Sequence, residues 1–159
     1  AVIHQGIIQQ IDDPENLYNK PASRFVAGMI GSPSMNFIEG TYETAGSETF
    51  LNCGTFKVNL TKFKSAIEKG SSSSELTFGI RPEYIKVDHK KISPSSVETT
   101  VVMEEPLGSE TILHVNVNED LIKAIVPPTF STIYGEKVWL EFDMDRMHIL
   151  DAKTEKVIV

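Results

Sequence analysis

Apolar residues recur with a helical period near the start of the chain. In residues 21–30 they fall at i, i+3, i+4, i+7 and i+8, which predicts one short amphipathic helix. The positions are Ala22, Phe25, Val26, Met29 and Ile30. Pro21 is expected to open this helix, because a proline at the first helical position leaves no backbone donor unpaired. Gly31 suits the left-handed turn that ends a helix, and Pro33 cannot continue one.

Two shorter elements precede this helix. Residues 2–11 predict a β-hairpin or a kinked strand, with Gly6 at the bend. Asp13 is expected to cap a helical turn, and Pro14 to take its first position.

From Met35 onward the pattern changes to short strands and turns. Apolar residues alternate with polar ones in several segments. These contain Phe56 and Val58; Leu76, Phe78 and Ile80; Val97 to Met103; Thr111 to Val117; and Val138, Leu140 and Phe142. One helix is expected at 61–69, with Gly70 as its stop, and the serines at 71–74 are expected to form a flexible surface loop.

Many short strands separated by turns favour a small barrel or sandwich over a parallel α/β fold. The sequence pattern changes near Pro33 from helical periodicity to the alternation typical of strands. We therefore expect the first third of the chain to be the end of a different domain. The remainder is expected to form a β-domain of about 125 residues, a usual domain size.

Composition narrows the function. The formal charge is −7, which argues against a nucleic-acid partner because contacts with phosphate need clustered Lys and Arg. The single cysteine, Cys53, excludes a disulfide within the chain. No apolar run approaches the roughly 20 residues of a transmembrane helix, and the start of the chain lacks the pattern of a secretory signal.

No catalytic, cofactor or metal site is predicted. The chain contains no phosphate-binding loop with a following lysine and no nucleophile elbow around a serine. No two of the four histidines are spaced as zinc ligands, and His114 is expected at the surface, on the polar face of its strand. The acidic pairs, such as Glu119/Asp120 and Asp143/Asp145, are interpreted as solvated turns or edges.

Four longer stretches resemble one family in their letters, order and spacing. They are "GIIQQIDDPENLYNKPASRFVAGMIGSPSMNF" at 6–37, "FGIRPEYIKV" at 78–87, "EPLGSETILHV" at 105–115 and "GEKVWLEFDMDRMHILD" at 135–151. Together they resemble the C-terminal part of the ATP-binding subunits of maltose-type ABC importers for sugars and related solutes.

The resemblance implies a domain organisation. Residues 1–33 would be the strand–helix end of an α/β nucleotide-binding domain. Residues 34–159 would form a mainly β, OB-like barrel with additional strands, the TOBE or MOI-type regulatory domain. The ATP-hydrolysing motifs of the family lie upstream of the matching region. The resemblance therefore implies no enzyme activity and no cofactor for this chain, with ATP and Mg bound only by a full-length protein.

The resemblance also implies partners. Regulatory domains of the family pair into homodimers and in some members receive regulatory proteins. Permease subunits would bind through the ATPase domain, and the full-length complex would lie in the cytoplasm on the inner face of the cell membrane. Two alternatives stay open: an OB-type module that senses a small ligand such as an oxyanion, and a standalone enzyme that uses the acidic pairs.

Three groups of residues are predicted to carry these roles. The interdomain joint consists of Gly31, Ser32, Pro33, Met35 and Asn36. The dimer or regulator contact consists of Gly79, Arg81, Pro82, Glu83, Leu107, Gly108, Glu110 and Thr111. For Arg81, an ion pair across the dimer and an internal ion pair at a strand end both remain open. Trp139 is interpreted as either a core residue or an interface anchor.

Overall fold

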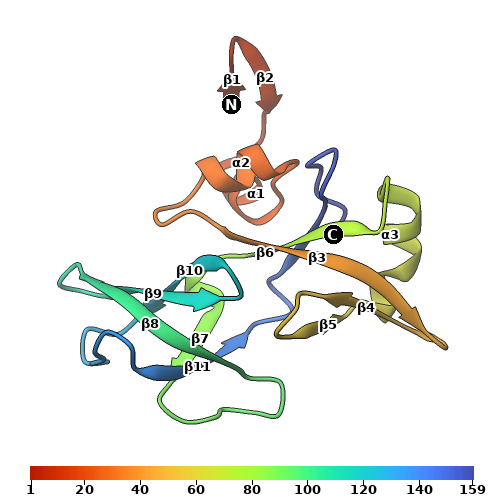
Figure 1. Ribbon diagram of the computed structural model, residues 1–159. Coiled ribbons are helices and arrows are strands. Elements are labelled where there is room, and N and C mark those ends of the chain that lie inside the picture. The colour runs from red at the N-terminus through yellow and green to blue at the C-terminus, as the bar shows by residue number, and fades with distance from the viewer. The chain divides into compact units, whose positions relative to one another are not determined.

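The computed structural model describes residues 1–159 as two compact units (Figure 1). Unit 1 contains residues 1–53, 58–79 and 148–159, and unit 2 contains residues 54–57 and 80–147. Each unit is built around a five-stranded sheet. The prediction of a mainly β fold is confirmed. The proposed boundary near Pro33 stays a prediction.

Unit 1 begins with the expected hairpin and capped helix. Strands β1 (Val2–His4) and β2 (Ile7–Gln10) pair antiparallel around Gly6, whose φ is +78°. Asp13 caps α1 (Pro14–Asn19), because its side chain accepts the backbone N–H of Asn16 at 2.8 Å. Both local predictions are confirmed.

Helix α2 (Arg24–Met29) is shorter than the predicted helix. Its N-cap is Ser23, whose side chain accepts the backbone N–H of Val26, so Pro21 does not open the helix. The two helices and β1 share a small core of Val2, Leu17 and Val26. Met29, on the predicted apolar face, is 53 % exposed.

The sheet of unit 1 has the order β12-β6-β3-β4-β5. Its strands are β3 (Asn36–Ala45), β4 (Glu48–Asn52), β5 (Lys57–Asn59), β6 (Glu75–Ile80) and β12 (His148–Asp151). Strand β6 is buried on both faces, so Thr77 is buried as well as Leu76 and Phe78. The Thr77 hydroxyl donates to Glu39 at 2.8 Å, which satisfies this polar group inside the sheet.

The segment between β5 and β6 corrects the prediction for Gly70. It forms η1 (Thr61–Phe63) and α3 (Lys64–Gly70), which includes Gly70 as its last residue. Gly70 does not have a positive φ; instead a Cβ there would lie 2.9 Å from Ile158 Cγ2. The serines at 71–74 form the expected loop and are mostly exposed, but Ser72 anchors it, because its backbone N–H and its hydroxyl both donate to the carboxylate of Asp151.

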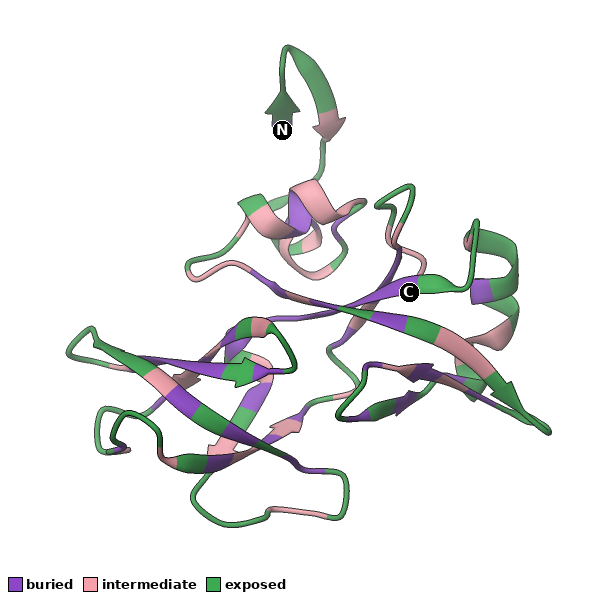
Figure 2. Cartoon of the chain, viewed as in Figure 1, coloured by how far each residue is buried: buried purple, intermediate pink, exposed green.

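The sheet of unit 2 has the order β10-β9-β8-β11-β7. Its strands are β7 (Ile85–Asp88), β8 (Val97–Pro106), β9 (Thr111–Val117), β10 (Asp120–Val126) and β11 (Lys137–Phe142), and η2 (Pro82–Tyr84) precedes β7. All neighbours pair antiparallel. Buried and exposed residues alternate along the first half of β8, as the sequence pattern predicts (Figure 2).

The prediction that His114 lies at the surface is wrong, because His114 is only 4 % exposed. It lies in the middle of β9, opposite Lys123 of β10 and Met103 of β8. Its Nε2 atom is 2.9 Å from Glu105 Oε1, an ion-pair distance without the alignment of a hydrogen bond. Strand β9 is buried at five successive positions from Thr111 to Val115, so the alternation of apolar and polar residues does not predict the burial of His114.

Candidate functional site

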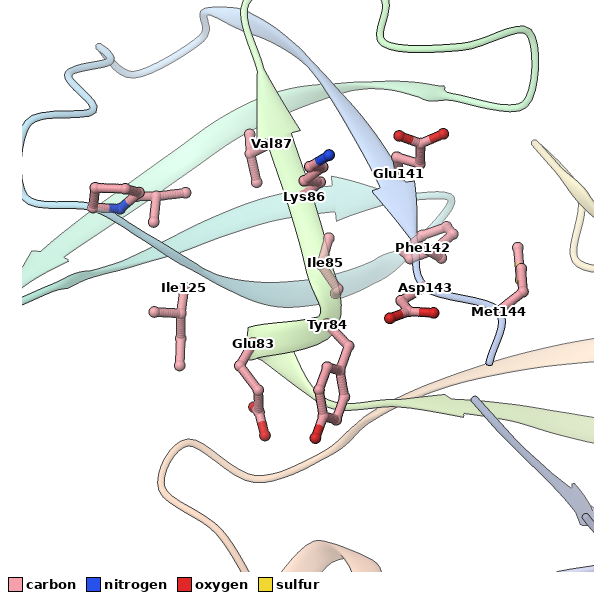
Figure 3. Close-up of a pocket in the computed structure, with 12 residues that line it drawn as sticks. Glu83, Tyr84, Ile85, Lys86, Val87, Ile125, Glu141, Phe142, Asp143 and Met144 are labelled. Carbon is pink, nitrogen blue, oxygen red and sulfur yellow. The ribbon is translucent and has the colours of Figure 1, made fainter. Parts of the chain in front are cut away.

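A pocket of about 520 Å³ lies at one end of the unit 2 sheet (Figure 3). We call it the β7–β11 pocket. Its lining residues come from η2, β7, the end of β10, β11 and the segments that follow β10 and β11. They are Glu83, Tyr84, Ile85, Lys86, Val87, Ile125, Val126, Pro127, Glu141, Phe142, Asp143 and Met144. A cavity of this size is within the usual range for ligand or side-chain binding.

Strand pairing builds the floor of the pocket. Phe142 at the end of β11 pairs with Ile85 at the start of β7, and both are almost fully buried. The ring of Phe142 also packs on Phe56 with the centroids 5.0 Å apart. Just beyond the pair, the backbone N–H of Asp143 donates to the carbonyl of Tyr84 at 3.0 Å, which fixes the two ends together.

The rim of the pocket carries more negative than positive charge. Glu83, Glu141 and Asp143 contribute carboxylates, whereas Lys86 is the single basic residue in the lining. Lys86 lies directly opposite Glu141 in the strand register. Glu83 and Tyr84 leave η2 on the same side, and Asp143 and Met144 follow the end of β11 (Figure 3). An apolar floor with carboxylates at its edge suits an apolar group that carries a hydrogen-bond donor.

Tyr84 is held in place at this rim. The guanidinium carbon of Arg146 lies 5.4 Å from the centroid of the Tyr84 ring. The backbone N–H of Arg146 in turn donates to the carbonyl of Asp143 at 3.0 Å. This cation–π contact orders the aromatic wall of the pocket.

The predicted contact residues around η2 differ in exposure. Arg81 is 2 % exposed and is among the largest fully buried side chains, and Pro82 is buried beside it. Glu83 is exposed and lines the pocket. The burial of Arg81 favours the internal role that the sequence left open. Gly79 belongs to unit 1, where a Cβ would lie 3.0 Å from Met35 Sδ.

The predicted contact residues around Gly108 form the turn between β8 and β9. Gly108 has a φ of +91°, and the backbone N–H of Leu107 donates to the carbonyl of Glu110 at 2.8 Å. Leu107 is 58 % exposed, whereas Thr111 is buried in the first position of β9. A partner could therefore reach Leu107 directly, while Gly108 supplies the backbone turn.

The predicted interdomain joint lies in unit 1 between α2 and β3. Gly31 has a φ of +118°, the Ser32–Pro33 bond is cis, and Asn36 begins β3. Met35 and Asn36 are buried, and Met35 lies against Gly79. The structure thus brings one residue of the joint next to one of the predicted contact residues.

Sequence patterns missed the β7–β11 pocket apart from Glu83. Asp143 was interpreted as part of a solvated edge, and it is exposed, but it lines the pocket as well. Trp139 is half-buried, with Lys91 Nζ 5.3 Å from its ring centroid. The structure holds no group of three or more His, Cys, Asp or Glu side chains arranged to bind a metal ion.

Two protein families match consecutive parts of the chain. Residues 31–85 match the MalK OB fold domain, and residues 78–150 match the TOBE domain. Residues 31–150 therefore belong to the MalK OB-fold and TOBE domain families. These are not catalytic ATPase domains, in agreement with the sequence prediction that the chain itself is not an enzyme.

Several curated relatives are ATP-binding proteins of ABC transporters. The chain is 37 % identical over 156 residues to the multiple sugar-binding transport ATP-binding protein MsmK of Streptococcus mutans, which covers 96 % of this chain and 41 % of that protein. It is 34 % identical over 168 residues to the trehalose/maltose import ATP-binding protein MalK of Thermococcus litoralis, with 99 % and 43 % covered. An uncharacterized ABC transporter ATP-binding protein of Bacillus subtilis, YurJ, is 33 % identical over 162 residues, with 99 % and 44 % covered.

The chain thus spans less than half the length of the relatives it matches. The family resemblance stated from the sequence is confirmed, and these OB-fold and TOBE domains are of the kind that sugar importer subunits carry. No helix of the structure has the length and apolar character needed to cross a membrane.

A solved structure shares the fold at low sequence identity. The cytoplasmic molybdate-binding protein ModG, with molybdate bound, aligns with a TM-score of 0.53 over 72 % of this chain and 94 % of that protein. The two sequences are 12 % identical. This likeness supports the fold assignment.

Proposed function

We propose that this chain is the regulatory and dimerisation part of the ATP-binding subunit of an ABC importer for sugars or related solutes. The observation that carries the proposal is the pair of consecutive family matches, together with relatives named for sugar and trehalose/maltose import. The full-length protein would bind ATP and Mg and lie in the cytoplasm against the membrane permease subunits. Residues 1–33 would belong to its nucleotide-binding domain and residues 34–159 to the regulatory domain.

The role of such a domain follows from effective concentration. If two regulatory domains stay paired, each closure of the attached ATPase domains becomes an intramolecular event. A regulatory protein can then control the ATPase when it binds one arrangement of the pair better than the other. Gly79, Arg81, Pro82 and Glu83, with Leu107, Gly108, Glu110 and Thr111, remain the residues that the sequence proposes for the dimer or the regulator.

Sensing of an oxyanion is the weaker alternative. The fold likeness to a molybdate-binding protein is a likeness of fold only. The β7–β11 pocket carries Glu83, Glu141 and Asp143, whose charges repel an anion. A thermal-shift series with molybdate, sulfate and phosphate should therefore leave the melting temperature unchanged, since a bound ligand would stabilise the native state.

Co-expression of two differently tagged copies of the chain tests the dimerisation directly. When either tag is captured on its affinity resin, we expect the eluate to contain both copies. A tagged copy of an unrelated β-domain serves as the control. Capture of one copy alone, in repeated purifications at low and high expression, would contradict the proposal.

A further inference from the structure

The connection between β10 and β11 ends in a turn that exposes two large apolar side chains. Ile133 is 73 % exposed and its neighbour Tyr134 is 83 % exposed, the two highest values among the large exposed hydrophobic residues. We call these two residues the apolar tip. Adjacent side chains of this size in water lose the stabilisation that burial would give, which is typical of a contact surface.

Hydrogen bonds hold the backbone of this turn. The Glu136 carboxylate accepts the backbone N–H of Ile133 at 3.0 Å, and the N–H of Glu136 returns to the carbonyl of Ile133 at 3.0 Å. Gly135 donates to the carbonyl of Val101 in β8, and Val101 donates back to the carbonyl of Glu136, both at 2.9 Å. The tip is therefore fixed to the sheet at its base.

Side chains on both flanks complete this support. Thr132 donates through its backbone N–H and its hydroxyl to Glu104 of β8. His89 contacts the second oxygen of Glu136 at 3.0 Å through Nδ1, and its ring stacks on Phe130 with the centroids 4.6 Å apart. A tip that is already ordered loses little further conformational freedom when it binds.

The β7–β11 pocket has the chemistry that this tip requires. Its apolar floor of Ile85, Ile125 and Phe142 suits the Ile133 side chain and the ring of Tyr134. Its carboxylates are acceptors for the Tyr134 hydroxyl, which needs a hydrogen-bond partner when it is buried. Unit 2 thus carries both the apolar tip and a cavity of matching chemistry, whose lining Figure 3 shows.

The two features lie at opposite ends of one strand. Strand β11 begins at Lys137, three residues after Tyr134, and ends at Phe142 in the pocket. Six residues of extended chain span about 20 Å, so the tip does not fill the pocket of its own strand. A two-fold axis that runs perpendicular to β11 and passes beside the middle of the strand, outside the chain, would bring the tip end of each copy to the pocket end of the other.

We propose that Ile133 and Tyr134 of one copy insert into the β7–β11 pocket of a second copy, and reciprocally. The inference rests on the proposed dimerisation and specifies its contact. Ile133 packs on the apolar floor, and the Tyr134 hydroxyl donates to a carboxylate at the rim. Glu83 then belongs to the dimer contact, as the sequence proposed.

Two variants remove the two sides of this contact separately. The tip variant is Ile133→Ser with Tyr134→Ser, at positions so exposed that the fold is unaffected. The pocket variant is Met144→Arg, at a half-buried residue outside the strands, where the longer side chain occupies the cavity. Leu121→Ser is the matched control, because Leu121 is 50 % exposed on β10 and belongs to neither feature. Circular dichroism checks that all variants keep the β fold.

Sedimentation equilibrium of single variants and of their mixture gives a distinctive pattern. Each variant alone should dissociate at least about tenfold more readily than the wild type, while Leu121→Ser should not. An equimolar mixture of the tip and pocket variants should associate better than either alone, because the mixed dimer keeps one intact tip and one intact pocket facing each other.

The outcomes separate this inference from the proposed function. Variants that dimerise as tightly as the wild type, or a mixture that associates no better than its components, would overturn the inference and leave dimerisation through another surface. A wild-type chain that stays monomeric would overturn both. If the pocket variant does not fold, Ile125→Ser replaces it at another half-buried lining position.

Discussion

The carboxylate of Asp151 accepts several hydrogen bonds at once. The backbone N–H groups of Ser72 and Thr154 donate to it at 2.5 and 2.6 Å. The backbone N–H of Lys153 and the hydroxyl of Ser72 donate to it as well. These backbone hydrogen bonds, Ser72 first and Thr154 second, hold the pKa of Asp151 well below its usual range. Asp151 therefore ties the serine segment and the chain end to β12 in its charged form.

Asp151→Asn should destabilise unit 1 by roughly 1–3 kcal/mol near neutral pH, since charge-assisted hydrogen bonds are lost. A depressed pKa in the folded state gives stability that is complete above the unfolded value of about 3.9 and is lost as the pH falls further. The deficit of the variant, measured by urea unfolding, should therefore shrink below about pH 4. Glu119→Gln, at an exposed turn residue, is the control. A deficit that is constant from pH 7 to pH 3 would contradict this account.

Cys53 is buried, and burial is the main reason that the pKa of its thiol rises to about 12, with the negative charge of Glu39 adding to the effect. Since the thiolate is the reactive form, a disulfide reagent at pH 8 should modify the folded chain only through unfolding or local opening. The rate should rise strongly in urea, where the same single cysteine provides the reference. Modification of the folded chain as fast as the unfolded one would show an accessible thiol.

At the scale of elements, two glycines differ in the space that the fold leaves for a side chain. In β3, a Cβ on Gly40 would lie 2.9 Å from the backbone carbonyl oxygen of Asn52, so the paired strand β4 leaves no room for it. In α2, a Cβ on Gly28 would meet only Phe37 Cε2, at an ordinary 3.7 Å.

Gly40→Ala should thus lower the free energy of unfolding by about 1–3 kcal/mol because of overpacking. Gly28→Ala should leave it unchanged or raise it by up to about 1 kcal/mol, since alanine favours the helix. Thermal and urea unfolding of the pair provide the comparison. Equal effects of the two substitutions would mean that the close approach of β3 and β4 does not limit the side chain at Gly40.

Local sequence chemistry predicted those elements whose determinants are adjacent in the chain. The bend at Gly6 and the Asp13 cap depend on neighbouring residues only, and both were predicted. The start of α2 was misplaced because Ser23 and Pro21 are both acceptable helix openers, and the Ser23 side chain bonds Val26. The burial of His114 and the Ser72–Asp151 bonds depend on strands distant in sequence, as does the β7–β11 pocket, so no local pattern contained them.

At the scale of the whole molecule, the role proposed for this chain is that of a pairing module. The family matches cover residues 31–150 with OB-fold and TOBE domains, and the relatives are more than twice as long as the chain. The proposed role requires that the chain associates with itself through a contact of its own. The apolar tip and the β7–β11 pocket provide one such contact.

Light scattering behind size exclusion, over a hundredfold range of concentration, tests this claim most directly. The account predicts a mass that rises with concentration toward twice 17.7 kDa and then stays constant, as expected for a closed two-fold dimer. A mass of one chain at every concentration would contradict the account. The regulatory domain would then have to act through some other partner.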